Sequence, residues 1–246
     1  MFVLYKTLVY LINFNVLFSE DRLILNSVTS LGFKIDLAYV LSNYYSETLL
    51  KGSIILTALF AVLGLLKKST YVSNFGLWFL VLNLSNFIYP TLTAGDYLLN
   101  QLLFFNVFFS HQQSRFGILN ELKVAIHNAG LLAIKIQICL AYLFAAWFKF
   151  IDVDWLNGLA VYQTFQTPEY SNDLFKEIPY SWCVVLNYAT MLYQLCFPLL
   201  IWFRKYKVYL FIFGITQHLL IAFGMGLFSF GIIMILCYIL FLKYDN

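Results

Sequence analysis

Apolar residues run along the chain in long stretches, separated by shorter segments that hold most of the charged residues. Several stretches approach the ~20 residues that a helix needs to cross a ~30 Å hydrocarbon core. The pattern predicts about eight membrane-spanning helices, at residues 2–18, 49–66, 71–93, 97–110, 128–150, 181–203, 207–225 and 227–243. Because helices satisfy their own backbone hydrogen bonds, the predicted fold is all-α, a polytopic transmembrane helical bundle forming a single domain over residues 1–246.

The basic residues predict how the chain is oriented in the membrane. They follow the second, fourth, sixth and eighth predicted spans, as Lys67, Lys68, Arg115, Lys123, Arg204, Lys205, Lys207 and Lys243. Since lysine and arginine favour the cytoplasmic side, both termini are predicted to be cytoplasmic and residues 19–48, 90–96 and 151–180 to lie outside. Residues 97–110 are short and polar for a span, which also allows a thinned, buried or re-entrant helix. Residues 33–45 could form an amphipathic helix in the outer interface.

Composition narrows the class of protein and its partners. Apolar residues make up 62% of the chain and charged residues 11%, whereas soluble domains carry about 25% charged residues. No basic run could follow a nucleic-acid backbone, so membrane lipid is the expected partner rather than nucleic acid. The four cysteines lie in predicted spans without metal-ligand spacing, as Cys139, Cys183, Cys196 and Cys237, and no metal is expected.

One histidine lies in the middle of a predicted span. His218 is in the seventh span, where an imidazole needs a hydrogen-bond partner. Asn187 and Gln194 are seven residues apart on one face of the sixth span and are the candidate partners. The arrangement fits a structural bond between helices as well as a ligand site.

A second polar group marks the predicted outer end of the fifth span. Lys149 ends that span and is followed by Asp152, Asp154 and Trp155. An amine and two carboxylates within six residues could carry chemistry. The same residues also fit an interfacial anchor, in which a lysine and a tryptophan lie at headgroup depth.

Three stretches resemble a known family. The run from Ala141 to Gly158, AYLFAAWFKFIDVDWLNG, is similar to the vitamin K-dependent γ-carboxylase where a lysine-bearing helix end precedes an acid-x-acid-Trp motif. His218 and the later stretch FGMGLFSF resemble that enzyme's histidine helix and the segment after it. The sequence TAGDY at residues 93–97 resembles the opening of a span in the bacterial HTTM (horizontally transferred transmembrane domain) proteins. The resemblance covers the membrane domain only.

The resemblance implies a hydrophobic cleft for a quinone or hydroquinone, with Lys149 and His218 as the catalytic residues. In the carboxylase a lysine deprotonates reduced vitamin K, and the histidine here would donate a hydrogen bond to a quinone oxygen. The family has two consecutive lysines before the acid-x-acid-Trp motif, and the second is the base. Here Lys149 takes the first position and Phe150 the second, and phenylalanine cannot accept a proton. Further contacts to the cofactor are expected from Trp155, Asp152, Asp154 and Gln194.

Three hypotheses for function follow. The first is an HTTM-type, multi-pass protein of the bacterial inner membrane that does not carboxylate glutamate. Its outward-facing apolar cavity would bind a quinone, a lipid or another subunit of an envelope complex. The second is a quinol-coupled enzyme with Lys149 as base. The third is a transporter, against which stand the few charges within the spans and the lack of an inverted repeat. The sequence does not identify the ligand, the partner or the oligomeric state.

Overall fold

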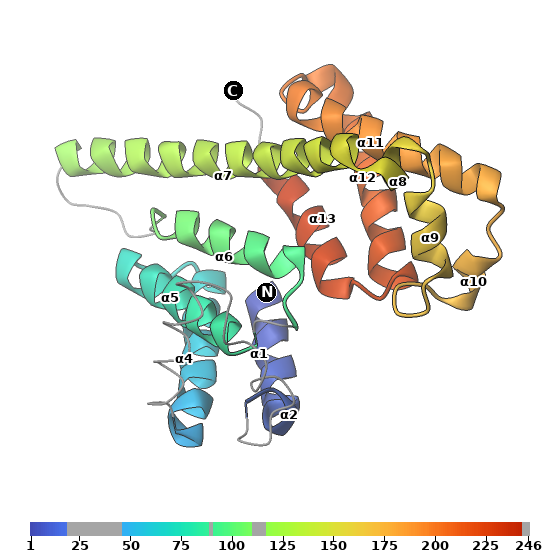
Figure 1. Ribbon diagram of the computed structural model, residues 1–246. Coiled ribbons are helices and arrows are strands. Elements are labelled where there is room, and N and C mark those ends of the chain that lie inside the picture. Colours follow the sequence, from blue (N-terminus) through green and yellow to red (C-terminus); the bar gives the residue numbers. More distant parts are fainter. Residues whose placement is uncertain (19–45, 89–90, 110–116, 243–246) are drawn as a thin grey trace. The chain divides into compact units, whose positions relative to one another are not determined.

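The computed structural model describes residues 1–18, 46–88, 91–109 and 117–242 (Figure 1). All regular structure in these ranges is helical, which confirms the predicted all-α class. The chain divides into two compact units, Met1–Leu131 and Leu132–Asn246, each of which is described by itself. The single bundle expected from the sequence stays a prediction, and the amphipathic helix expected at residues 33–45 lies outside the described residues.

Unit 1 is built from five helices in its described residues and the first part of a sixth. Its elements are α1 (Phe2–Ile12), α2 (Phe14–Phe18), α4 (Glu47–Leu65), α5 (Tyr71–Phe87), α6 (Ala94–Asn106) and the beginning of α7 (Gly117–Ile151). Helix α1 packs against α4, α4 against α5, and α5 against α6. The predicted helix over residues 2–18 is interrupted at Asn13, whose side-chain amide donates to the carbonyl of Val9, 3.0 Å away.

The core of unit 1 lies where the end of the first helix pair meets α4 and α5. Its buried residues are Tyr10, Phe14, Phe18, Leu50, Ile54, Leu84, Phe87 and Ile88. The rings of Phe14 and Phe18 stack with centroids 5.5 Å apart. Because residues late in α1 and α5 meet residues early in α4, α4 runs antiparallel to both.

Unit 2 combines the remainder of α7 with the helices that follow it. These are α8 (Val153–Leu156), α9 (Ala160–Gln166), α10 (Asp173–Lys176), α11 (Tyr180–Leu200), α12 (Arg204–Leu219), the π-helical turn η2 (Leu220–Gly224) and α13 (Phe228–Leu242). Helix α12 packs against both α11 and α13, and η2 packs against α13. The short helices α8, α9 and α10 fill the segment that the sequence places between two spans.

Four helices in the described residues are long and apolar enough to cross a membrane. They cover Glu47–Leu65, Asn120–Ile151, Tyr180–Leu200 and Arg204–Gly224, and Phe2–Ile12 and Phe228–Leu242 are shorter apolar helices. Less than a third of the residues in each of the four is buried. Long apolar helices that expose most of their side chains need lipid around them, which supports a membrane protein. The number of eight spans and the side of the termini stay predictions.

Candidate functional site

His218 occupies the last turn of α12, where the helix changes geometry. The residues directly after α12 form the π-helical turn η2, and single turns of this kind occur frequently at functional sites. His218 is 3% exposed although it belongs to an apolar helix. A buried imidazole in such surroundings needs hydrogen bonds from neighbouring helices.

Three tyrosines from three helices form a series of hydrogen bonds that ends at His218. The hydroxyl of Tyr142 in α7 lies 2.8 Å from Nε2 of His218 and 2.6 Å from the hydroxyl of Tyr238 in α13. The Tyr238 hydroxyl lies 2.8 Å from that of Tyr193 in α11. Tyr193 donates in turn to the backbone carbonyl of Leu210, at 3.3 Å. The four side chains therefore form one continuous chain, which we call the tyrosine–histidine chain.

The direction of each hydrogen bond follows from the acceptor at the end of the series, the carbonyl of Leu210. The Leu210 carbonyl can only accept, and each hydroxyl carries a single proton. Tyr193 therefore donates to Leu210, Tyr238 donates to Tyr193, and Tyr142 donates to Tyr238. The oxygen of Tyr142 is left to accept from Nε2–H of His218. Because burial without a charged partner favours the neutral imidazole, the proton lies on Nε2 and Nδ1 keeps a bare lone pair.

The Nδ1 atom of His218 is buried and has no hydrogen-bond partner in the described residues. A buried acceptor without a partner costs about 1–3 kcal/mol. Three other amide oxygens of unit 2 share this condition, on Asn187 and Gln194 in α11 and on Gln217 in α12. The bare Nδ1 is an acceptor, which a molecule carrying a hydroxyl or amine donor would satisfy.

A glycine lets the tyrosine hydroxyls approach the backbone of α12. A Cβ atom on Gly214 would collide with the hydroxyls of both Tyr193 and Tyr238. Gly214 lies one turn before His218 on the same helix face, so any side chain there would push apart the bonds that hold the imidazole. The glycine is therefore part of the construction of the site.

Lys149 and Trp155, both predicted as site residues, lie together. The Lys149 amine is 4.5 Å from the centre of the Trp155 ring and 3.4 Å from the carbonyl of Ala145. An ammonium over the face of an indole is a favourable cation–π contact. Lys149 is seven residues after Tyr142, hence on the same face of α7 and about 10 Å further along it. One helix face therefore presents both the amine and the hydroxyl that binds His218.

The two predicted acids have different surroundings. The Asp152 carboxylate caps α8, accepting from the backbone N–H of Asp154 at 2.9 Å and that of Trp155 at 3.3 Å. The side chain of Asp154 is exposed to solvent. Phe150, which stands where the family has its base, is 42% exposed. Asp152 therefore caps the start of a helix.

The predicted partners of His218 make other contacts. The Asn187 amide donates to the carbonyl of Trp155 at 2.8 Å, which fixes α8 against α11. Gln194 is not bonded to His218 either, since its amide oxygen has no partner and the imidazole bonds to Tyr142. The prediction of Asn187 or Gln194 as partner was therefore wrong. The available signal was a tyrosine in the middle of three predicted spans, because tyrosine usually lies at membrane interfaces.

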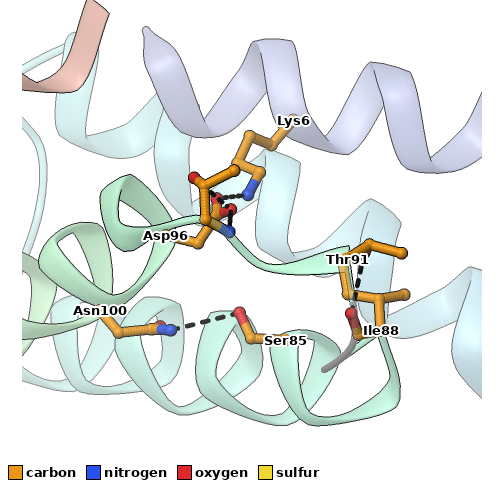
Figure 2. Close-up of polar contacts among 7 residues, drawn as sticks. Lys6, Ser85, Ile88, Thr91, Asp96 and Asn100 are labelled. Atoms are coloured by element: carbon orange, nitrogen blue, oxygen red, sulfur yellow. Dashed lines mark hydrogen bonds and ion pairs between the residues drawn. The ribbon is translucent and has the colours of Figure 1, made fainter. Parts of the chain in front are cut away.

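A second buried polar cluster lies in unit 1 and is an ion pair. Figure 2 shows the Lys6 amine of α1 directed at the Asp96 carboxylate of α6, and the two side chains are 12% and 6% exposed. The other carboxylate oxygen of Asp96 accepts from the backbone N–H of Thr93 at 2.8 Å and from its hydroxyl at 3.0 Å. Asp96 thus belongs to the capping box at the start of α6 and also pairs with a lysine 90 residues away in the sequence.

Next to this pair, the Asn100 amide donates to the Ser85 hydroxyl at 3.2 Å (Figure 2). The described residues contain no group of three or more histidine, cysteine or acidic side chains that could hold a metal ion.

No protein-family model matches the chain, and no curated protein or solved structure matches it significantly.

Proposed function

We propose that the chain is an integral membrane protein that binds one apolar molecule with a hydroxyl head, a quinol, at His218. It would retain the scaffold of the HTTM and vitamin K-dependent γ-carboxylase-like proteins without carboxylating glutamate. The sequence motifs around Lys149 and His218 support the scaffold. Phe150 in place of the second lysine argues against the carboxylase reaction, since no side chain at that position can take the proton.

The bare Nδ1 of His218 carries the proposal. A quinol hydroxyl would donate to this atom and remove the cost of an unpaired acceptor, about 1–3 kcal/mol or roughly tenfold or more in affinity. A quinone has only carbonyl oxygens at its head and cannot donate. The direction of the tyrosine–histidine chain therefore favours the reduced ligand, and it makes His218 an acceptor rather than the donor expected from the sequence.

The surroundings favour a small molecule over a partner subunit at this position. His218 is 3% exposed and packs against Tyr142 of α7 and Tyr238 of α13, so another protein chain could reach it only by insertion into the unit. An isoprenoid quinol has an apolar tail suited to lipid and a head small enough to enter between helices.

Lys149 and Trp155 would lie at the entrance, at headgroup depth. The Trp155 ring faces the Lys149 amine and holds it in place. We therefore assign Lys149 the role of a positioning residue at the membrane rim. Residues 151–180 would face the periplasm of a bacterial inner membrane, in the eight-span arrangement with cytoplasmic termini that the basic residues predict.

Two substitutions of the same residue test the proposal. Glutamine can place its amide near the position of Nε2, whereas asparagine can place it near that of Nδ1. In the purified protein, His218→Gln should keep the bond to Tyr142 and weaken binding of decyl-benzoquinol by roughly tenfold, whereas His218→Asn should bind it within about threefold of wild type. Binding is measured by quenching of tryptophan fluorescence.

The ligand supplies the matching control. The dimethyl ether of the same quinol keeps the ring and tail but has no donor, and it should bind wild type roughly tenfold more weakly than the quinol. His127→Gln, in unit 1 beside the Phe109 ring, should leave quinol binding unchanged. Equal binding of quinol and ether, or equal binding by wild type and His218→Gln, would refute the proposal.

A further inference from the structure

The charges of unit 2 are sorted between its two ends. In its described residues the five acids all lie between α7 and α11, as Asp152, Asp154, Glu169, Asp173 and Glu177. Four of its six cations lie elsewhere, as Lys135, Arg204, Lys205 and Lys207. Along α7, Lys135 is sixteen residues before Ile151, about 24 Å at 1.5 Å per residue. One end therefore carries positive charge without an acid among the described residues of the unit.

Two of these lysines come from different helices and meet at the end of a third. The Lys207 amine of α12 donates to the carbonyl of Phe241 in α13 at 3.1 Å. The Lys135 amine of α7 lies 6.0 Å from the centre of the Phe241 ring. Arg204 and Lys205 occupy the first turn of α12 and are exposed. We call these four residues the basic end.

Aromatic and apolar side chains border the basic end. The Trp202 ring packs edge-on against Phe241, with centroids 6.0 Å apart, and its indole N–H donates to the carbonyl of Pro198 at 2.9 Å. Leu199 and Phe203 are 64% and 58% exposed. A tryptophan held in this way between cations and exposed apolar residues is typical of the boundary between headgroups and acyl chains.

We propose that the basic end binds the headgroup of an anionic phospholipid, with its acyl chains against the exposed apolar residues of α11 and α12. The cations are complementary to a phosphodiester, and basic pockets between transmembrane helices on the cytoplasmic side are suited to such lipids. The C-terminal carbonyls of α13 add negative charge, and Lys207 already binds one of them. The proposal does not depend on a ligand at His218.

Lipid titration of the full-length protein in a neutral detergent tests this site. Phosphatidylglycerol should raise the melting temperature, whereas phosphatidylcholine and inorganic phosphate should not. In Lys135→Gln/Lys207→Gln the half-saturating concentration of phosphatidylglycerol should rise about 25-fold, because each lysine contributes a factor of about five. Native mass spectrometry counts the phosphatidylglycerol molecules that remain bound.

Two further variants keep the test decisive. Arg204→Gln/Lys205→Gln changes exposed side chains of the same end and should also weaken phosphatidylglycerol binding by more than fivefold, even if loss of the Lys207 bond unfolds the first variant. Lys176→Gln removes an exposed lysine from the opposite end and should bind as wild type does. An equal response to phosphatidylcholine, stabilisation by phosphate alone, or unchanged binding in Arg204→Gln/Lys205→Gln would overturn the proposal.

Discussion

The two buried polar clusters, Lys6–Asp96 in unit 1 and the tyrosine–histidine chain in unit 2, differ in how completely they are satisfied. The Asp96 carboxylate receives hydrogen bonds from Lys6 and from both donors of Thr93. In the second cluster every hydroxyl has a partner, yet Nδ1 of His218 has none among the described residues. We call the first cluster closed because both carboxylate oxygens of Asp96 are bonded, whereas the second cluster ends at an acceptor without a donor among the described residues.

The difference has a physical reason. An unpaired charge in an apolar interior costs several kcal/mol, so a charged cluster is stable only when it is closed. An unpaired imidazole nitrogen costs about 1–3 kcal/mol, which a stable unit can tolerate and a ligand can recover. We therefore interpret the ion pair as a connection between α1 and α6 and the tyrosine–histidine chain as a binding site.

Removing one partner of the Lys6–Asp96 pair should have the largest effect on the free energy of unfolding. Lys6→Met or Asp96→Ala leaves a buried charge alone and should lower the free energy of unfolding by about 3–5 kcal/mol. The double variant Lys6→Met/Asp96→Ala should be more stable than either single variant, because no charge remains unpaired. Steric trapping in detergent measures the free energy of unfolding of all three variants.

The exposed pair Lys51–Glu47, 3.3 Å apart, is the matched control. Lys51→Met should change stability by less than about 1 kcal/mol, since exposed pairs contribute little. If Lys6→Met were no more destabilising than Lys51→Met, the closed cluster would not be the connection that we describe.

Displacing the tyrosines should have the next largest effect. Gly214→Ala puts a methyl group where the hydroxyls of Tyr193 and Tyr238 lie, and it should destabilise unit 2 by about 1–3 kcal/mol. Gly52→Ala in α4 has open space around the new Cβ and should stabilise the protein slightly, by about 0.5–1 kcal/mol. Thermal unfolding of both variants checks the contrast, and destabilisation by Gly52→Ala alone would contradict it.

Removing one hydroxyl from the tyrosine–histidine chain should have a smaller effect on stability. Tyr142→Phe removes the acceptor of His218 Nε2–H and should cost about 1–2 kcal/mol of unfolding free energy. Tyr188→Phe removes a hydroxyl that donates to the carbonyl of Leu156 at an exposed position, and should cost less. Equal losses in chemical denaturation would mean that the buried chain contributes no more than a surface bond.

The smallest effect is expected outside the clusters, at Lys176 and Asp173. A hydrogen bond from Lys176, 2.9 Å long, and the charge of Lys176 lower the pKa of Asp173. A carboxyl group whose pKa is lower in the folded than in the unfolded protein stabilises the fold at pH values above its unfolded-state pKa. This stabilisation is lost as the pH falls through the folded-state pKa. Lys176→Gln should return this pKa to its ordinary value without a measurable change in melting temperature at pH 7. NMR titration of the Asp173 carboxyl measures the shift.

The elements that were predicted correctly are those with a strong local signal. Long apolar runs gave α4, α7, α11 and α12, because length and hydropathy decide such helices. The interruption at Asn13 was not predicted, since a single polar residue in an apolar run is compatible with a continuous helix.

The contacts within the site could not be read from the sequence. Tyr142, Tyr193 and Tyr238 lie in different spans, and only the packing of α7, α11 and α13 brings their hydroxyls together. Helix periodicity ranks the faces of one helix but does not say which helices become neighbours. For the same reason periodicity alone predicts a partner for His218 on α11, whereas its partner is on α7.

The state of the His218 ring tests the central claim most directly. Nitrogen-15 NMR of histidine-labelled protein distinguishes a protonated ring nitrogen from a bare one, and the signal absent from His218→Gln identifies this residue among the three histidines. We predict a protonated Nε2 and a bare Nδ1, whose resonance moves when the quinol is added and not when its dimethyl ether is added. A proton on Nδ1 in the ligand-free protein would reverse the tyrosine–histidine chain and contradict the proposed site.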